Sequence, residues 1–266
     1  MTKVTVEAMA DLERQNYTAM QSMVAVTPGV ELILRDDMII TSSQVFPTPD
    51  ANHACLLRAT PETAPALIAE VVEHFTSREL PPTIFVSPAC TPEDLPELLA
   101  ARGFVRQKER EAWMVLEKAE DLVRSTPSAR VEVHSIDKSE AMTFAAVFLK
   151  AFGMPGEYAA PMAEVLSPSI GLPGMFHYVA TFDGEPLGVC TLICHAELAI
   201  FGSVGIVASL RGLKVLSGLV AHAYADGYAW GCKRALIQTT AGGALERFAR
   251  ITGLKTYFTR TCYTLT

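Results

Sequence analysis

The chain has 266 residues, half of them apolar and 19% charged, with a formal net charge of −7. This length suits one large or two ordinary domains, and the apolar content suffices for a core that needs neither disulfides nor metals. No run of lysine or arginine stands out, so the composition favours neither nucleic acid nor a membrane surface as a partner.

The first 116 residues have the pattern of an α/β unit. Residues 1–15 contain acids where an export signal would be apolar, so we expect a cytoplasmic protein. Helical periodicity covers 7–24, and strand-like runs on both sides of Asp36-Asp37 predict a hairpin. The pattern then predicts a short strand at 54–57, a helix at 60–75, a strand at 83–87, a helix from Thr91 to Gly103 and a strand-like run at 104–116.

A polar stretch separates this unit from a second one. Residues 118–129 contain Pro127 and few apolar side chains, which is typical of a linker. We therefore predict two domains, residues 1–125 and 126–266.

The second unit begins with a strand at 131–135. The pattern then predicts helices at 138–151 and 156–166, strands at 176–182, 187–194 and 198–207, a helix at 212–226, a strand at 234–239, a helix at 243–251 and a strand-rich tail from 254. The apolar stretch 187–207 has His195 and Glu197 at its centre, so we interpret it as two buried strands joined by a turn rather than a membrane span.

The two halves share a weak pattern at an offset of 150 residues. In each half a helix ends at a glycine and a strand pair is expected to follow. Chance produces some coincidences of this kind, but we favour a duplication, with Arg110 and Arg260 as a repeated surface or ion-pair feature. The matched pairs are Leu95 and Leu245, Gly103 and Gly253, Arg110 and Arg260, Trp113 and Tyr263, and Val115 and Leu265.

The stretch 201–216 carries the strongest functional signal. A strand leads into a tight turn at Arg211-Gly212, and an amphipathic helix follows. The first amides of a helix have no internal partners, and the helix dipole adds positive charge there. Together with the Arg211 guanidinium and the small Gly212, this end is suited to a diphosphate.

This stretch resembles the signature of the GNAT N-acetyltransferase superfamily, Arg/Gln-x-x-Gly-x-Gly/Ala at a helix start after a strand. The order of elements over about 130–266 is also similar to that fold, and the first half resembles a degenerate copy. The chain departs from the signature at Lys214 and Leu216, where glycine and glycine or alanine are usual, and at Phe248 and Ala249, where a tyrosine often lies.

The resemblance implies an α/β fold with a mixed α+β sheet in two tandem GNAT-like domains, and acetyl-CoA as cosubstrate. It places strand residues beside the pantetheine, the turn and helix residues around the pyrophosphate, and two threonines at the thioester pocket. The implied coenzyme residues are Val204, Gly205, Ile206, Arg211, Gly212, Leu213, Lys214, Val215, Leu216, Thr239 and Thr240. In the first half, residues 57–62 lack glycine, so we assign no coenzyme site there.

Transfer of an acetyl group needs a base for the amine and an acid for the sulfur. The resemblance makes Glu197 the first candidate for the base and His195 the second, and Tyr257 or Tyr263 candidates for the acid. Each also has an ordinary structural interpretation, as an exposed turn residue or as a packing residue, and both interpretations stay open.

Other chemistries find little support. The six cysteines show no C-x-x-C spacing, so we interpret them as small core residues in a reducing compartment and expect no metal. Ser217 lies outside any Gly-x-Ser-x-Gly motif, and no Gly-x-Gly-x-x-Gly follows a strand.

Three functions therefore stand as hypotheses. The first is an acetyl-CoA-dependent N-acetyltransferase acting on a small amine or amino-acid-like acceptor. The second is a non-catalytic protein that binds acyl-CoA or another protein as a sensor or scaffold. The third is binding of a ligand between the halves without a coenzyme. A homodimer is left open.

Overall fold

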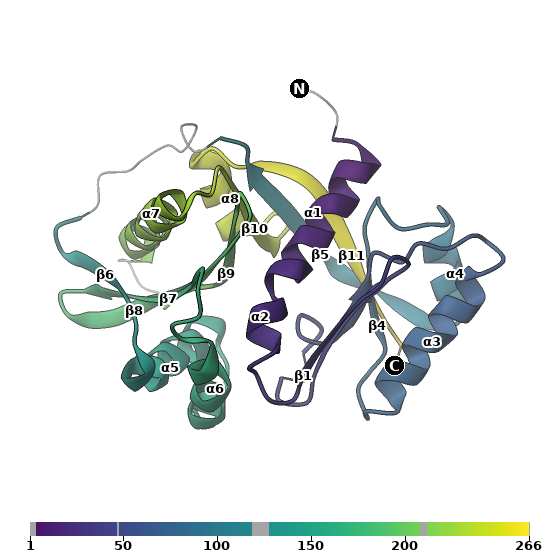
Figure 1. Ribbon diagram of the computed structural model, residues 1–266, viewed down its shortest axis with the longest axis horizontal. Coiled ribbons are helices and arrows are strands. Elements are labelled where there is room, and N and C mark those ends of the chain that lie inside the picture. Colours follow the sequence, from purple (N-terminus) through teal and green to yellow (C-terminus); the bar gives the residue numbers. More distant parts are fainter. Residues whose placement is uncertain (1–3, 47, 119–127, 208–211, 266) are drawn as a thin grey trace.

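The structure is a computed structural model that describes residues 4–46, 48–118, 128–207 and 212–265; at 212 and 213 it describes the backbone only. In the described residues the strands form one 11-stranded sheet that runs through both halves, with helices packed against it (Figure 1). The strand order is β1-β2-β3-β4-β11-β5-β10-β9-β8-β7-β6, with both parallel and antiparallel pairs. The predicted mixed α/β fold is confirmed.

The first half follows the predicted order of elements. Its first helix begins after Thr5, whose hydroxyl oxygen accepts a hydrogen bond from the Ala8 amide at 3.2 Å, an N-cap interaction. The predicted hairpin around Asp36-Asp37 is present as β1 and β2. The elements are α1 (Val6–Ala19), α2 (Gln21–Val24), β1 (Val30–Leu34), β2 (Ile39–Ser43), β3 (His53–Cys55), α3 (Ala64–Thr76), β4 (Thr83–Val86), α4 (Leu95–Ala101) and β5 (Phe104–Leu116).

The second half also follows the prediction. A capping box at Asp137 and Glu140 opens its first helical segment, and Gly153 ends that segment in the left-handed conformation. The elements are β6 (Val131–Ser135), α5 (Ala141–Phe152), α6 (Ala159–Leu166), β7 (Met175–Phe182), β8 (Glu185–His195), β9 (Leu198–Ile206), α7 (Gly212–Trp230), β10 (Arg234–Thr240), α8 (Ala244–Ile251) and β11 (Lys255–Leu265).

The last strand of each half lies within the other half. The expected strand pair after each glycine was wrong, because Gly103 and Gly253 are each followed by one long strand. These strands, β5 and β11, pair with each other in antiparallel. In addition β11 pairs with β4, and β5 pairs with β10, so each half completes its sheet with a strand from the other half.

This exchange gives the sheet a pseudo-twofold arrangement. The parallel pair β3–β4 in the first half corresponds to β9–β10 in the second, and β4–β11 corresponds to β10–β5. At the centre of the sheet Arg110 lies opposite Thr261, and Arg260 lies opposite Glu111. Arg110 and Arg260 are thus one residue out of register with each other. Equivalent residues of two strands related by a twofold axis lie close together in this way. The linker residues 119–127 lie outside the described residues, and the boundary at 125/126 stays a prediction.

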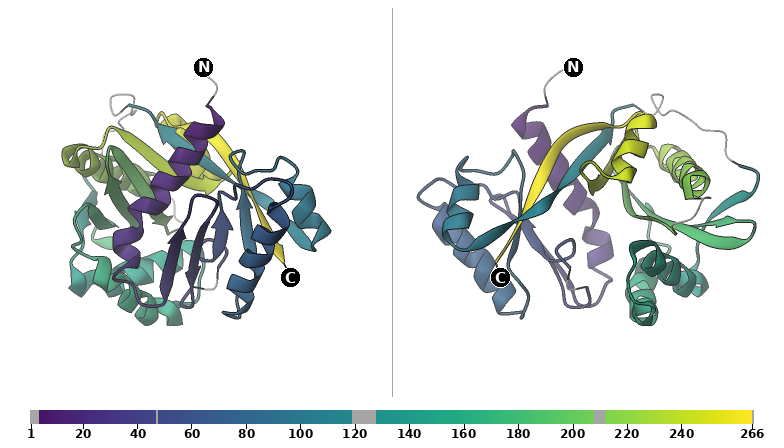
Figure 2. Two further views of the ribbon diagram at one scale, coloured as in Figure 1. Left: turned by 45° about the vertical axis from the view of Figure 1, so that its right-hand side comes forward. Right: turned by 180° about the vertical axis from the view of Figure 1, so that it is seen from behind.

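One of the buried hydrophobic clusters contains residues from both halves. In the second half, α7 and α8 cover one face of the sheet, and α5 and α6 lie on the opposite face (Figures 1 and 2). Helix α1 runs across the middle, where Leu12 and Tyr17 belong to the same buried cluster as Trp113 of β5, Leu198 of β9 and Leu236 of β10. The amino-terminal helix is therefore part of the core of both halves.

Candidate active site

The strongest candidate for a binding site is a separation between β9 and β10. The two strands pair in parallel over a short stretch that ends at Phe201 opposite Ile237. Beyond this point β9 stays paired with β8, and β10 stays paired with β5. We call the diverging segments, residues 202–206 of β9 and residues 238–240 of β10, the split.

A bulge in β9 accounts for the divergence. The register with β8 shifts by one residue between the pair Val189–Gly205 and the pair Thr191–Gly202. Within the bulge, Ser203 has a φ of 52°, in the left-handed region. A bulge bends its strand and increases the local twist, so β9 turns away from β10. Along this edge of β9, the backbone N–H and C=O groups have no strand partner among the described strands and are available to a ligand.

Five of the predicted coenzyme residues border the split. They are Val204, Gly205 and Ile206 on β9, and Thr239 and Thr240 on β10. At Gly205 the strand touches α5, because a Cβ added there would lie 2.8 Å from Cε2 of Phe152. A glycine at this position thus allows β9 and α5 to approach closely.

The predicted diphosphate site lies at the start of α7. This helix begins at Gly212, while Arg211 and the side chain of Leu213 lie outside the described residues. The Lys214 side chain is exposed, and Val215 and Leu216 are buried in the core. Val215 and Leu216 can therefore contribute only backbone groups to a ligand, whereas the Lys214 ammonium group is open to one.

An apolar pocket adjoins the split on the side of α7 and α8. Phe201 and Ile237, the last paired residues of β9 and β10, form its base, and Leu245 and Phe248 of α8 form one wall. Phe248 occupies the helix position at which the family resemblance leads us to expect a tyrosine. The pocket therefore offers an apolar surface and no acid at that position.

The structure does not bring Glu197 to the split. Glu197 lies in the turn between β8 and β9, its side chain is 61% exposed, and it forms an ion pair with Lys233. This turn is at the paired end of β9, roughly 17 Å along the strand from Gly202. His195 is the last residue of β8, beside this turn and opposite Leu198. The ordinary interpretation as turn residues fits this location better than a role as catalytic base.

Neither tyrosine candidate borders the split. Tyr257 lies on β11, which is separated from β10 by β5, so about 10 Å of sheet lie between them. Tyr263 lies opposite Ile84 of β4 and is buried in the core of the first half. Of the residues predicted for the reaction itself, none lies at the split.

The corresponding gap in the first half is closed. After the parallel pair β3–β4, the Thr91 amide donates to the Leu57 carbonyl at 2.9 Å, and the Thr91 hydroxyl donates to the Ala59 carbonyl at 3.0 Å. The start of α3 is also occupied, because Thr60 and Thr63 bond each other's backbone amides. These bonds join the two strands where the second half has its split.

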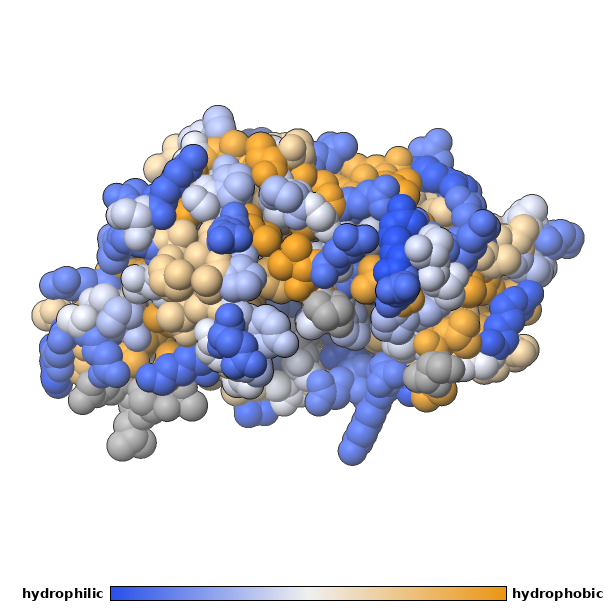
Figure 3. Space-filling view, turned by 90° about the horizontal axis from the view of Figure 1, so that it is seen from below, coloured by the Kyte–Doolittle hydropathy of each residue, from blue (hydrophilic) through white to orange (hydrophobic). Residues whose placement is uncertain are grey.

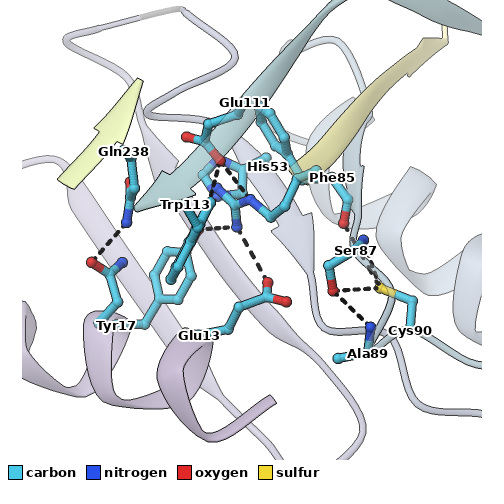
Figure 4. A network of polar contacts seen from close by, with 12 residues as sticks. Glu13, Tyr17, His53, Phe85, Ser87, Ala89, Cys90, Glu111, Trp113 and Gln238 are labelled. Carbon is cyan, nitrogen blue, oxygen red and sulfur yellow. Dashed lines mark hydrogen bonds and ion pairs between the residues drawn. The ribbon is translucent and has the colours of Figure 1, made fainter. Parts of the chain in front are cut away.

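A buried ionic cluster lies at the centre of the sheet, where β5 and β11 cross (Figure 4). Arg260 is 1% exposed, and its guanidinium donates to Oε2 of Glu111 at 2.7 Å, to Tyr17 Oη at 2.9 Å and to Oε2 of Glu13 at 3.4 Å. The guanidinium also lies 4.7 Å from the ring centres of both Phe85 and Trp113. Sequence reasoning expected an ion pair or a surface feature at Arg260, and the ion-pair alternative is the one found.

Burial controls the protonation of this cluster. It raises the pKa of Glu13 and Tyr17 and lowers the pKa of His53 to about 3, so His53 is neutral at pH 7. The His53 ring nitrogen Nε2 lies 2.5 Å from Tyr17 Oη. Sequence analysis missed Glu13 and Tyr17, although their spacing of four residues places both on the face of α1 that also carries Leu12. A charged residue on a core-facing stripe was the available signal.

The described residues contain no group of three or more histidine, cysteine, aspartate or glutamate side chains arranged to hold a metal ion. All six cysteines lie in described segments and are unpaired thiols, and all but Cys194 are buried. Across the described segments, no helix has the length and apolar character needed to cross a membrane.

Neither a protein-family model nor a curated protein matches the sequence. Solved structures do match the fold. A GCN5-related N-acetyltransferase from Kribbella flavida has a TM-score of 0.69 at 15% identity, covering 94% of this chain and 94% of that one. A tandem GNAT protein from the clavulanic acid biosynthesis pathway has a TM-score of 0.57 at 14% identity, covering 96% and 95%. A GCN5-related N-acetyltransferase from Sphaerobacter thermophilus has a TM-score of 0.53 at 14% identity, covering 98% and 94%.

Proposed function

Because the chain has the GNAT fold in two tandem copies, we propose that its second half binds acetyl-CoA at the split and transfers the acetyl group to an amine. The observation that carries this proposal is the separation of β9 from β10 after Phe201 and Ile237. It leaves a strand edge with free backbone groups beside an apolar pocket and the start of a 19-residue helix.

Each part of the site suits one part of the coenzyme. The unpaired edge of β9 offers N–H and C=O groups to the amides of a pantetheine arm, in the manner of an added strand. The apolar surface that Phe201, Ile237 and Phe248 provide suits its methylene groups. At the start of α7, the free amides, Lys214 and Arg211 favour a diphosphate.

When bound, acetyl-CoA supplies the thioester. The amine nitrogen forms a bond to the carbonyl carbon as the carbon–sulfur bond breaks, and the proton lost by the nitrogen is balanced by one taken up by the thiolate. N–H groups on the unpaired edge of β9 would hold the carbonyl oxygen as charge develops there. Solvent supplies the proton to sulfur in this scheme, since Phe248 has no proton to donate.

Binding is tested first by titrating the chain with acetyl-CoA. We expect a rise in melting temperature in the wild type and its loss in Arg211→Glu. Arg58→Glu is the matched control, because Arg58 is exposed in the closed β3–α3 connection of the first half. No response at millimolar acetyl-CoA would contradict the proposal and leave ligand binding without a coenzyme. An equal response in all three proteins would contradict the diphosphate site at the start of α7.

The absence of an acid or base at the described split favours one second candidate, a non-catalytic protein that binds acyl-CoA as a sensor. Release of free thiol in the presence of amines separates the two. We expect amine-dependent release above the rate of hydrolysis. Tight binding of acetyl-CoA with no release for any amine would establish the sensor instead.

A further inference from the structure

The split opens toward two faces of the sheet, and the two faces differ. One face carries α7, α8 and the apolar pocket that contains Ile237. The opposite face carries α1 and α5, as the contact of Gly205 with Phe152 shows. Side chains alternate along a strand, so Gln238 and Thr240 of β10 point away from the pocket, toward α1. The Gln238 amide confirms this, because it donates to Oδ1 of Asn16 on α1 at 2.8 Å.

Apolar side chains border this second opening on the α5 side. Phe152 is 51% exposed, and its ring centre lies 4.4 Å from that of Phe148 in a tilted arrangement. The α5–α6 region shows apolar surface between charged side chains (Figure 3). The α5 side of the opening is therefore apolar at Phe148 and Phe152, and the side of β10 is the place to look for a partner of a charged ligand group.

Glu111 provides a charge on that side. It lies opposite Thr240 in the antiparallel pair of β5 and β10, and Trp113 lies opposite Gln238. Residues opposite each other in such a pair point to the same face, with their Cβ atoms about 5 Å apart. Glu111 therefore stands beside Thr240, at the end of β10 that borders the split and on the face of α1.

The Glu111 carboxylate is held rigidly at one oxygen. Its Oε2 accepts hydrogen bonds from Trp113 Nε1 and Arg260 Nε, both at 2.7 Å (Figure 4). Its side chain is 19% exposed, in contrast to 2% for Arg260 and 0% for Glu13. Among the described residues, no hydrogen bond is made to Oε1. One carboxylate oxygen is thus fixed by the protein and the other is open to a ligand.

Arg260 is the only cation in direct contact with Glu111 among the described residues, and it also contacts Glu13. Tyr17 and His53, which complete the cluster, are neutral at pH 7, because burial raises the pKa of the first and lowers that of the second. Arg260 reaches Glu111 only at Oε2, so the second carboxylate oxygen has no cationic partner among the described residues.

We infer that Glu111, a residue of the first half, binds a cationic nitrogen of the acceptor used by the second half. The inference rests on the proposed function for the site of transfer. Glu111 is on β5, the strand next to β10, so it lies one strand spacing, about 5 Å, from the strand that borders the split. Glu111 is thus placed to bind a second nitrogen of the acceptor while the reacting one reaches the thioester. The acceptor class is a diamine, or an amine with a second charged nitrogen, rather than an amine with a neutral tail.

Acetyl transfer to 1,4-diaminobutane and to 2-phenylethylamine tests the inference in the full chain. In Glu111→Gln we expect the KM for the diamine to rise about tenfold or more, the range for loss of a charge-assisted hydrogen bond. The KM values for acetyl-CoA and for 2-phenylethylamine should stay within about twofold of wild type, whereas a merely structural role would alter all three. Glu109→Gln, at an exposed position of the same strand, is the matched control.

Two further variants guard against misfolding. Glu111→Asp retains the charge and should keep part of the preference for the diamine. The double variant Glu111→Gln/Arg260→Met removes both charges together, which a fold tolerates better than one charge left unpaired; it should fold and lack the preference. An unchanged KM for the diamine in Glu111→Gln, or the same preference in the folded double variant, would overturn the inference.

Binding without the coenzyme separates this inference from the proposed function. The probe is 1,4-diaminobutane alone, read as a shift in melting temperature. A shift in the wild type and in Glu109→Gln that is lost in Glu111→Gln supports the role of Glu111 even if acetyl-CoA does not bind. Equal behaviour of the wild type and Glu111→Gln, including no shift in either, counts against it.

Discussion

Phe248 places an apolar ring in the pocket between α7 and α8, at the helix position where a tyrosine would protonate the leaving sulfur. In the proposed reaction, Phe248 leaves this position without an acid. A single hydroxyl group is all that separates the two side chains, so the position can be tested with little change in packing.

We expect Phe248→Tyr to raise kcat for acetyl transfer about tenfold or more, because a positioned general acid contributes that much or more in many enzymes. The KM for acetyl-CoA should change little. Steady-state thiol release with a fixed amine measures both. Phe248→Leu is the control for altered packing and should show no gain. A tyrosine variant no faster than wild type would show that proton transfer to sulfur does not limit the rate.

Two buried histidines make stability depend on pH. His53 contacts Tyr17 and the Pro49 carbonyl, and His177 lies 2.9 Å from both Ser169 Oγ and Thr191 Oγ1. Burial lowers the pKa of His53 to about 3 and that of His177 to about 4. The unfolded chain, with a histidine pKa near 6.5, binds more protons than the folded one between about pH 4 and pH 6.5, so stability rises with pH in that window.

At pH 5 each histidine therefore lowers the free energy of unfolding by about 2 kcal/mol relative to pH 7. Urea unfolding at the two pH values should show a clear drop in midpoint at pH 5. In His177→Asn, this drop should be smaller. Equal midpoints at pH 5 and pH 7 in the wild type would contradict the assignment of both rings as neutral.

Strand β9 combines a bulge with a glycine under α5, and this combination opens the split. A Cβ at Gly205 would lie 2.8 Å from Phe152 Cε2 and 3.0 Å from the Ala151 Cβ, whereas a Cβ at Gly202 would meet nothing within 4 Å. The two glycines lie on the same strand within the split. Substitutions at Gly205 and Gly202 therefore distinguish the effect of steric crowding against α5 from the effect of losing a glycine.

We expect Gly205→Val to lower the free energy of unfolding by about 1–3 kcal/mol through overpacking against α5. Because β9 must shift to relieve the contact, acetyl-CoA binding should weaken by more than this loss of stability explains. Thermal unfolding and calorimetric titration measure the two effects. Gly202→Ala should bind acetyl-CoA normally, and a similarly weak Gly202→Ala would show that backbone freedom, not close packing, matters.

The elements of this fold were largely predictable from local patterns, since periodicity placed most of the helices and strands within a few residues. The strand at 131–135 and the turn at Asp183-Gly184 agree with their predicted positions. Among the residues expected at the coenzyme site or in the reaction, Val204 and Thr239 border the split, whereas Glu197 lies away from it. Its position depends on how far the β8–β9 turn lies from the bulge at Ser203, and no local pattern marks that bulge.

At the scale of the whole molecule, the reciprocal exchange of β5 and β11 decides how the chain folds. The repeat at an offset of 150 residues indicated two similar units, but not that each would take its last strand from the other. Both units are rich in apolar strands, and partner choice between such strands depends on long-range register and packing. The hydrophobic cluster around α1, which includes Trp113 and Leu236, is a second contact between the halves.

We therefore expect residues 1–118 and residues 128–266 to be unfolded or aggregated when each is expressed alone, because each exposes long unpaired strand edges. Co-expressed, they should form a folded one-to-one complex. Circular dichroism and size-exclusion chromatography measure both outcomes. A full chain cut within 119–127 after folding is the control and should stay associated. A monomeric, cooperatively unfolding 128–266 fragment would show that the second half needs no strand from the first.

The bonds made by Thr91 have a consequence for how the two copies differ. They close the gap between the strands of the first half, whereas the corresponding gap in the second half is open. The two halves are therefore similar in fold but differ in the site that each can form. Under the proposed function, this difference predicts one acetyl-CoA bound per chain. The first half then binds no coenzyme and can contribute residues such as Glu111 to acceptor binding.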